Sequence, residues 1–235
     1  MTTPRYWAVV PAAGSGRRMQ SIVPKQYLSL AGRPVLEHTL VRLARQPELA
    51  GIVVALSADD EYWATLAIKS DIPLYTAGGG SERHLSVLYA LRDLASFAAP
   101  DDWVLVHDAA RPCVRNEDIS RLIHSVRDDP VGGLLAVPVT ETVKRATEDQ
   151  RVIETVDRRH LWRAQTPQMF RLQSLLQALE QVVSDRQLVT DEAGAMEYCG
   201  MAPRIVPGHA DNIKITEPQD LGLAEHFLRQ QVDQS

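Results

Sequence analysis

Pro11-Ala12-Ala13-Gly14-Ser15-Gly16-Arg17-Arg18-Met19 is a run of small and basic residues that directly follows the apolar stretch Tyr6 to Val10. This order is typical of a strand that leads into a ligand-binding loop. Glycine and alanine let a ligand approach the main chain, and the N–H groups of such a loop can form an anion-binding concavity. Arg17, Arg18 and the nearby Lys25 add positive charge. Main-chain donors beside fixed cations predict a triphosphate site.

Two familiar phosphate-binding loops do not match this stretch. The P-loop requires a Lys-Ser or Lys-Thr pair, and none follows Gly16. The dinucleotide fingerprint requires Gly or Ala where Met19 stands. The pattern that remains, Gly-x-Gly-x-Arg with a later Pro-Lys, resembles the signature of nucleotidyltransferases. An ordinary glycine-rich turn with surface cations is the alternative, and the preceding strand together with Lys25 argues against it.

Composition limits the kinds of partner. The chain has 235 residues, 45% of them hydrophobic, and a net charge of -5, so the cations of the first loop are a local feature of an acidic protein. This favours a small anionic ligand over nucleic acid. Cys113 and Cys199 suggest no disulfide framework, which fits a reducing cytoplasm. No apolar run approaches the ~18 residues of a membrane span. We therefore expect a cytoplasmic protein without a membrane or nucleic-acid partner.

Strand and helix patterns alternate through the first 138 residues. Strands are expected at 6–10, 51–56, 73–75, 103–106 and 133–137, and helices at 35–46, 59–68, 84–94 and 116–126. This alternation predicts an α/β fold with a doubly wound, mostly parallel sheet. Ligands of such sheets bind beyond the carboxyl ends of the strands. After residue 160 we expect helices at 171–183, 191–198 and 217–230, and short strands at 204–206 and 213–215.

The alternation breaks between residues 139 and 159. Two β-rich runs, 142–146 and 152–156, are joined by polar residues, which predicts a hairpin. An isolated hairpin is marginal in water, so it either folds back on the domain or packs against another chain. We favour a protruding arm that makes a symmetric homodimer. The chain then divides into a nucleotidyltransferase domain, 1–138 and 160–235, and a β-hairpin dimerisation arm, 139–159.

Three further groups could carry chemistry. Gly78-Gly79-Gly80-Ser81-Glu82-Arg83 again allows close approach to the main chain, although a flexible turn is the alternative. Asp108, at the end of an expected strand, could hold Mg²⁺ together with phosphate oxygens, or could simply start a turn. Lys214 lies within an expected apolar strand, where a cation usually has an anionic partner. Thr166-Pro167-Gln168 is expected to be a polar turn, and zinc and serine-nucleophile motifs are absent from the sequence.

Taken together, the motifs resemble one family. PAAGSGRRM, PKQYL, GGGSERHLSV, VHDAARP, TVDR, TPQMF, TDEA and DNIKIT occur in the order they take in the 2-C-methyl-D-erythritol 4-phosphate cytidylyltransferase family, over roughly residues 6 to 228. The resemblance implies a Rossmann-like nucleotidyltransferase of the non-mevalonate isoprenoid pathway. Such an enzyme transfers CMP from CTP to 2-C-methyl-D-erythritol 4-phosphate and releases pyrophosphate. The alternatives are a cytidylyltransferase for another polyol phosphate, such as ribitol 5-phosphate, and a nucleotide-binding regulator without turnover.

The resemblance also implies roles for individual residues. The residues that would hold the nucleotide are Ala12, Ala13, Gly14, Gly16, Gly80 and Ser86. Arg18 and Lys25 would stabilise the transition state, and Asp108 would bind Mg²⁺. The residues that would contact the methylerythritol phosphate are Thr190, Lys214 and Arg158, the last reached from the partner subunit through the arm. Ser81 departs from the family, where Asp is frequent, and this puts base selectivity in question.

Overall fold

The computed structural model describes residues 3–14 and 23–232. Its centre is a seven-stranded sheet in the order β11-β7-β10-β6-β1-β4-β5. These strands are β1 (Tyr6–Pro11), β4 (Leu49–Leu56), β5 (Leu74–Gly78), β6 (Trp103–Val106), β7 (Gly132–Pro138), β10 (Trp162–Arg171) and β11 (Arg204–Pro207). Only β10 is antiparallel to its neighbours, β6 and β7. The predicted α/β class with a mostly parallel sheet is confirmed.

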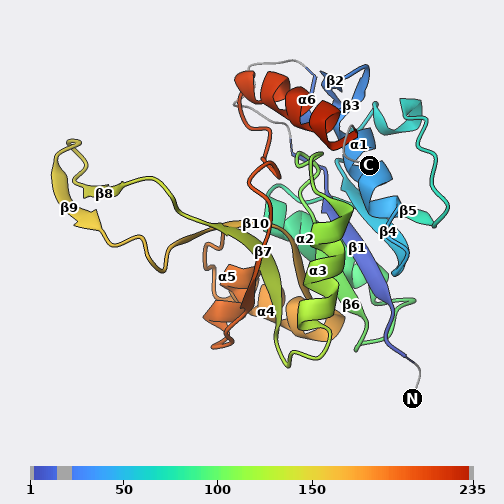
Figure 1. Ribbon diagram of the computed structural model, residues 1–235. Helices are drawn as coiled ribbons and strands as arrows, with labels where there is room; N and C mark the ends of the chain where they lie inside the picture. Colours follow the sequence, from blue (N-terminus) through green and yellow to red (C-terminus); the bar gives the residue numbers. More distant parts are fainter. Residues whose placement is uncertain (1–2, 15–22, 233–235) are drawn as a thin grey trace.

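Helices cover both faces of the sheet (Figure 1). They are α1 (Val35–Ala44), α2 (Arg83–Leu94), α3 (Asn116–Val126), α4 (Leu172–Ser184), α5 (Glu192–Tyr198) and α6 (Gln219–Val232). Along β1, Val9 packs with α2 and α4, whereas Ala8 and Val10 pack with α1 and α3. This is the two-residue period of a strand buried on both faces. Among the described residues, the helices are too short or too polar to cross a membrane.

The helix expected over 59–68 is wrong. The chain forms only the 3-10 turn η3 (Trp63–Thr65) there, and Leu66 is already extended. Asp60 explains the early stop, since its carboxylate accepts hydrogen bonds from the main-chain N–H groups of Tyr62 (3.0 Å) and Trp63 (2.9 Å). Asx turns of this kind compete with helix formation.

Two elements of the last third also differ from expectation. Residues 166–168 are not a surface turn: they lie within β10, where the register with β7 shifts between Ala164 and Gln168. The shift places Pro167, which cannot donate to a ladder, at an irregularity of the strand. Residues 213–215 do not form a strand. The N–H of Ile215 donates one main-chain hydrogen bond, to the carbonyl of Ala110 (2.8 Å), and this bond is not part of a ladder.

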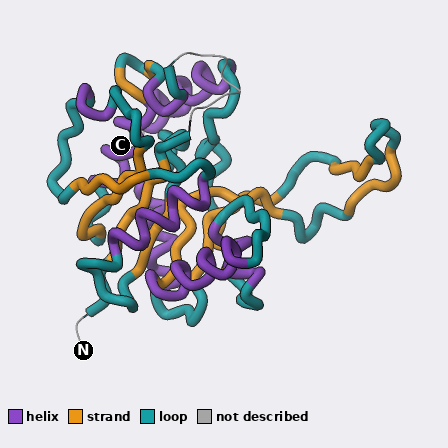
Figure 2. Tube along the Cα trace, turned by 180° about the vertical axis from the view of Figure 1, so that it is seen from behind, coloured by secondary structure: helices purple, strands orange, loops and turns teal. Residues whose placement is uncertain are grey.

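The hairpin of the middle segment is present. Strands β8 (Val143–Ala146) and β9 (Val152–Val156) pair antiparallel. Figures 1 and 2 show this hairpin projecting away from the body of the protein. The side chains of Val152 and Ile153 are 63% and 59% exposed, which is unusual for apolar strand residues. The role of the hairpin as a dimerisation arm stays a prediction.

Candidate active site

Two adjoining cavities lie beyond the carboxyl ends of β1, β5 and β6. The first, of about 280 Å³, is lined by Pro11, Ala12, Ala13, Gly14, Lys25, Gln26, Gly80, Ser81, Glu82, Arg83, Ser86, Asp108, Ala109, Ala110, Lys214 and Thr216. The second, of about 210 Å³, is lined by Arg83, Asp108, Arg111, Ala164, Gln165, Thr166, Gln168, Thr190, Asp191 and Lys214. Arg83, Asp108 and Lys214 line both cavities, so these three side chains stand between two binding volumes.

Main chain forms two walls of the first cavity. Ala12, just after β1, adds one more main-chain hydrogen bond to the pairing with β4, from its N–H to the carbonyl of Ala55 (2.8 Å). The loop after β5 packs so tightly against it that a Cβ on Gly79 would lie 2.2 Å from that of Ala13. Glycine is therefore required where the two loops meet. The predicted Ala12, Ala13, Gly14 and Gly80 all line this cavity, whereas Gly16 lies outside the described residues.

Ser86 holds the Gly80 loop in place. Its hydroxyl accepts a hydrogen bond from the N–H of Gly80 (3.1 Å) and lies 3.1 Å from the carbonyl of Glu82. Ser86 is buried in the first turn of α2, so the helix fixes the position of the loop. The N-terminus of a helix offers main-chain N–H groups that suit an anionic ligand, and the start of α2 lines this cavity.

Lys25 belongs to the 3-10 turn η2 (Lys25–Tyr27), and three side chains of this turn are tethered to other elements. The ammonium of Lys25 donates to the carbonyl of Ile215 (3.1 Å), and the amide of Gln26 donates to the carbonyl of Ala12 (2.6 Å). The hydroxyl of Tyr27 donates to Asp60 (2.7 Å), and burial together with this carboxylate raises the pKa of Tyr27. Lys25 is thus held at the first cavity. Its predicted companion Arg18 lies outside the described residues.

Asp108 joins three cations at the boundary of the two cavities. Its Oδ1 accepts from Nε of Arg83 (2.7 Å), and its Oδ2 pairs with Nε of Arg111 (3.3 Å) and Nζ of Lys214 (2.9 Å). Burial would raise the pKa of this carboxyl, but the three charges outweigh it and hold the pKa well below its usual value. The anionic partner predicted for Lys214 is therefore Asp108.

Arg83 connects this cluster to α5. Its Nη1 and Nη2 donate to the two carboxylate oxygens of Glu192 at 2.6 and 3.0 Å. Burial alone would lower the pKa of Arg83, yet Glu192 and Asp108 hold it above its ordinary value. The side chain of Glu192 is 1% exposed, so this is a buried, bidentate ion pair. With Arg111 and Lys214, three cations gather around the carboxylates of Asp108 and Glu192, where a phosphate can bind. Asp191 adds a third carboxylate to the lining of the second cavity.

The second cavity contains one of the two remaining predicted contacts. Thr190 lines it, next to Asp191, whose carboxylate caps α5 by accepting from the N–H of Gly194 (2.9 Å). Arg158 does not line either cavity: it is exposed at the base of the hairpin, where its guanidinium donates to the carbonyl of Thr140. The structure of one chain therefore does not bring Arg158 to the other predicted site residues.

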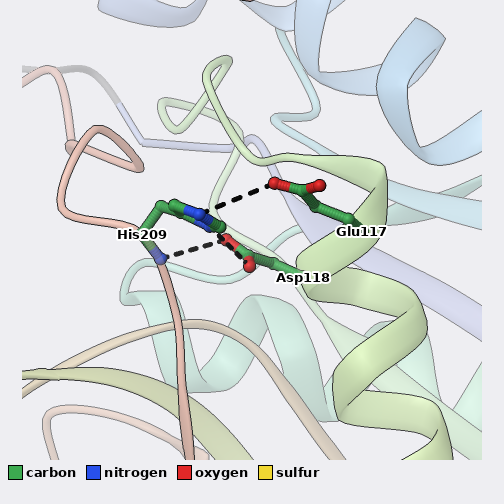
Figure 3. A group of neighbouring side chains, drawn as sticks. All are labelled: Glu117, Asp118 and His209. Atoms are coloured by element: carbon green, nitrogen blue, oxygen red, sulfur yellow. Dashed lines mark hydrogen bonds and ion pairs between the residues drawn. The ribbon is translucent and has the colours of Figure 1, made fainter.

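A carboxylate and histidine cluster fixes the segment that carries Lys214. Figure 3 shows His209 facing Glu117 and Asp118 of α3. The main-chain N–H of His209 donates to Oδ2 of Asp118 (3.0 Å), and its ring nitrogen Nδ1 lies 2.8 Å from Oδ1 of the same carboxylate. Both carboxylates are already paired, Asp118 with Arg121 (2.6 Å) and Glu117 with Arg115 (3.2 Å). We interpret this cluster as a structural tether.

Sequence reasoning assigned no role to Arg83, Thr166 or Glu192, all of which help to form the site. Arg83 and Arg111 stand in the quoted motifs, so their places just after β5 and β6, at the start of α2 and in the loop after β6, were the available signal. Glu192 lies 109 residues from its partner Arg83, and no local pattern marks such a pair.

The described residues do not fit a direct bond from Asp108 to Mg²⁺. Magnesium is usually bound through one or two carboxylates together with substrate phosphates. Both oxygens of Asp108 are engaged by cations at 2.7 to 3.3 Å, and a divalent ion at the same carboxylate would be repelled by them. The predicted role of Asp108 as a metal ligand thus has no support in this arrangement.

Comparison with known proteins agrees with the geometry. This chain is 54% identical over 219 residues to the 2-C-methyl-D-erythritol 4-phosphate cytidylyltransferase of Pseudomonas fluorescens (strain SBW25), and the match covers 93% of each chain. It is also 54% identical over 227 residues to the enzyme of that name from Ectopseudomonas mendocina (strain ymp), covering 96% of this chain and 95% of the relative.

Solved structures show the same likeness. The 2-C-methyl-D-erythritol 4-phosphate cytidylyltransferase of Francisella tularensis superposes with a TM-score of 0.82 at 37% identity, covering 95% of this chain and 99% of that one. A family profile described as IspD, 2-C-methyl-D-erythritol 4-phosphate cytidylyltransferase, matches residues 6–230. The chain therefore belongs to the 2-C-methyl-D-erythritol 4-phosphate cytidylyltransferase family.

Proposed function

We propose that the chain transfers CMP from CTP to 2-C-methyl-D-erythritol 4-phosphate, giving 4-diphosphocytidyl-2-C-methyl-D-erythritol and pyrophosphate. Family membership supports the reaction, and one observation of the structure carries the assignment of its site. Two cavities of about 280 and 210 Å³ share Asp108 and two of its cations, Arg83 and Lys214. CTP binds in the first cavity and the polyol phosphate in the second, so that the two phosphates meet at the shared cations.

The chemistry is a direct in-line displacement. A phosphate oxygen of the polyol phosphate attacks the α-phosphorus of CTP, the bond from that phosphorus to the β-phosphate oxygen breaks, and pyrophosphate leaves. The attacking oxygen is already anionic near neutral pH, so no general base is needed. The main obstacle is repulsion between two polyanions, and catalysis rests on positioning and positive charge.

The side chains divide this work by cavity. Lys25, with Arg18, stabilises the charge that develops on the α-phosphate and the leaving pyrophosphate. Lys214 and Arg111 bind the incoming phosphate. Before the substrate arrives, the carboxylate of Asp108 is the anionic partner of these two cations. Because the neighbouring cations hold the pKa of Asp108 well below its usual value, its carboxylate stays ionised and keeps those cations in place before the substrate binds.

Magnesium remains part of the proposal, and the triphosphate, rather than Asp108, would supply its ligands. A polyphosphate supplies the hard oxygen ligands that Mg²⁺ prefers. The ion, when bound, neutralises phosphate charge. The positioning roles of Lys25 and Lys214 are independent of it.

We also propose that the active form is a homodimer in which the hairpin of one subunit completes the site of the other. Arg158 supports this, since it stands exposed beside the hairpin and away from both cavities of its own chain. The exposed Val152 and Ile153 offer apolar surface to a second subunit. Arg158 of one chain would then contact the polyol phosphate in the other. The cytoplasmic location expected from the two cysteines likewise stays a prediction.

Ser81 lines the first cavity, so the departure from the family falls within the nucleotide site. Loops that bind through main-chain groups tolerate such a change, and the Gly80 loop is held by Ser86 whatever side chain follows it. We propose that base recognition here uses main-chain atoms.

Pyrophosphate release tests the function and separates the alternatives. The assay compares CTP with 2-C-methyl-D-erythritol 4-phosphate, CTP with ribitol 5-phosphate, and CTP alone. The proposal predicts rapid release only with the first pair. Release with ribitol 5-phosphate instead would establish the other polyol phosphate, and CTP binding without release would establish a regulator.

A further inference from the structure

His107 is a fully buried residue next to Asp108, and both of its ring nitrogens have partners. Nε2 lies 3.1 Å from the carbonyl oxygen of Arg111, and Nδ1 lies 3.0 Å from the hydroxyl of Thr166. Its exposure is 0%. The carbonyl can only accept, so Nε2 must carry the hydrogen. Burial lowers the pKa of His107 to about 4, so the ring is neutral at physiological pH and Nδ1 carries no hydrogen.

The tautomer of His107 decides the direction of the hydroxyl of Thr166. Because Nδ1 is an acceptor, the Thr166 hydroxyl donates its hydrogen to it. The same oxygen accepts the main-chain N–H of Asp108 at 3.0 Å. A hydroxyl has one hydrogen and two lone pairs. Thr166 therefore retains one acceptor lone pair and no hydrogen for a ligand.

Thr166 lines the second cavity together with cationic side chains. A phosphate oxygen is an acceptor, so it gains nothing from Thr166 and is attracted to Lys214 and Arg111. A carbinol hydroxyl of the substrate can donate to Thr166. We propose that His107 is a positioning residue that makes Thr166 an acceptor for a substrate hydroxyl and so orients the polyol phosphate, with its hydroxyl-bearing end at Thr166 and its phosphate at the cations.

This inference rests on the proposed function and deepens it, because it assigns the orientation of the polyol phosphate. It is distinct from a purely structural role for His107. A structural role would disturb the loop after β6, which borders both cavities, and would affect CTP and polyol phosphate alike. A positioning role through Thr166 affects the polyol phosphate alone.

The test is a double-mutant cycle in the full-length protein, with the KM of each substrate as readout. The variants are Thr166→Val, which removes the hydroxyl, Thr166→Ser, which keeps it, His107→Gln, and the pair His107→Gln with Thr166→Val. His107→Asn is a conservative rescue, since its amide oxygen can accept near the place of Nδ1. Urea unfolding and CTP binding check that each variant is folded.

The proposal predicts that Thr166→Val and His107→Gln each raise the KM for methylerythritol phosphate by about 5- to 10-fold, the usual worth of one neutral hydrogen bond. The KM for CTP stays within about twofold, and the double variant is no worse than Thr166→Val alone, because the two residues act as one unit. Thr166→Ser and His107→Asn should lie close to the wild type. The inference would be overturned if the fold-changes of the two single variants multiplied in the double variant. Equal rises in the KM values for CTP and methylerythritol phosphate would also overturn it.

Monodeoxy analogues of the substrate provide an independent readout if the His107 variants do not fold. One analogue should be a poorer substrate than its parent for the wild type, and Thr166→Val should lose that discrimination. Retained discrimination in Thr166→Val overturns the inference. A wild type that releases no pyrophosphate with methylerythritol phosphate would instead refute the proposed function, so the two failures are distinguishable.

Discussion

Replacement of Arg83 by methionine should destabilise the protein more than any exposed arginine change on the same helix. Arg83 is 25% exposed and its guanidinium makes two short bonds to Glu192, which is 1% exposed. Methionine keeps an unbranched apolar stem but lacks the guanidinium, and so leaves the carboxylate of Glu192 buried without a cation. Asp108 loses one of its three partners and keeps the other two.

The magnitude follows from that uncompensated charge. Removal of one partner of a buried ion pair typically costs about 3–5 kcal/mol, and we expect Arg83→Met to lower the free energy of unfolding by this amount. Neutralising the orphan with Glu192→Gln in the same chain should recover about 2–3 kcal/mol of it. Arg92→Met is the matched control. Arg92 lies on α2 and pairs with Glu180, but both side chains are about half exposed, so the cost should be under about 1 kcal/mol.

Urea denaturation of the two single variants, the double variant and the control measures these terms at neutral pH. The reasoning is refuted if the effects of Arg83→Met and Glu192→Gln add within about 0.5 kcal/mol, since independent residues behave in that way. Equal costs for Arg83→Met and Arg92→Met would also refute it, because burial would then have no influence.

Three further predictions concern catalysis, pH and assembly. Lys25→Ala should lower turnover on the order of 10²–10³-fold, because one preorganised charge is lost from the first cavity. The control variant Lys69→Ala, at an exposed lysine, should not lower turnover. Activity of Lys25→Ala within threefold of the wild type would contradict the role of Lys25. His107 has a folded pKa of about 4 against an ordinary 6.5, so its contribution to stability is complete above pH 6.5 and is lost as the pH falls. Urea denaturation at pH 7 and pH 4 should therefore show wild type losing about 3 kcal/mol more than His107→Asn, and equal losses would count against a neutral buried ring. Mixed Arg158→Ala and Lys25→Ala subunits should regain activity through hybrid dimers if the hairpin of one subunit serves the other, and no recovery after demonstrated subunit exchange argues against a shared site.

The parallel part of the fold could be predicted because its strands are continuous apolar runs and its helices follow at regular spacing. Residues 103–106 are an example: all four are buried, and a strand covered on both faces reads as uninterrupted hydrophobicity. β10 could not be predicted in the same way. Its centre, Gln165 to Gln168, is polar, and the buried amides of Gln165 and Gln168 donate to main-chain carbonyls of Asn212 and Gln165 respectively.

The residues of the site likewise divide into those that a local sequence pattern indicates and those that it does not. The first cavity could be predicted in part, because glycine-rich loops directly after strands indicate close approach to the main chain, as at Gly80. The second cavity depends on pairs between distant elements, such as Arg83 with Glu192, and their side chains carry no local signal. Lys214 was found through its apolar neighbours, but the strand inferred from those neighbours is absent, since Ile213 and Ile215 pack against α6 and its surroundings instead of forming a ladder.

The central claim is that CTP and the polyol phosphate occupy separate cavities that meet at Asp108. The most direct test measures both KM values for two variants, one from each cavity. Ser86→Ala releases the Gly80 loop and should raise the KM for CTP alone, whereas Thr190→Val should raise the KM for methylerythritol phosphate alone, each by about 5- to 10-fold. If each variant instead raises both KM values equally, the division of the substrates between two cavities is contradicted.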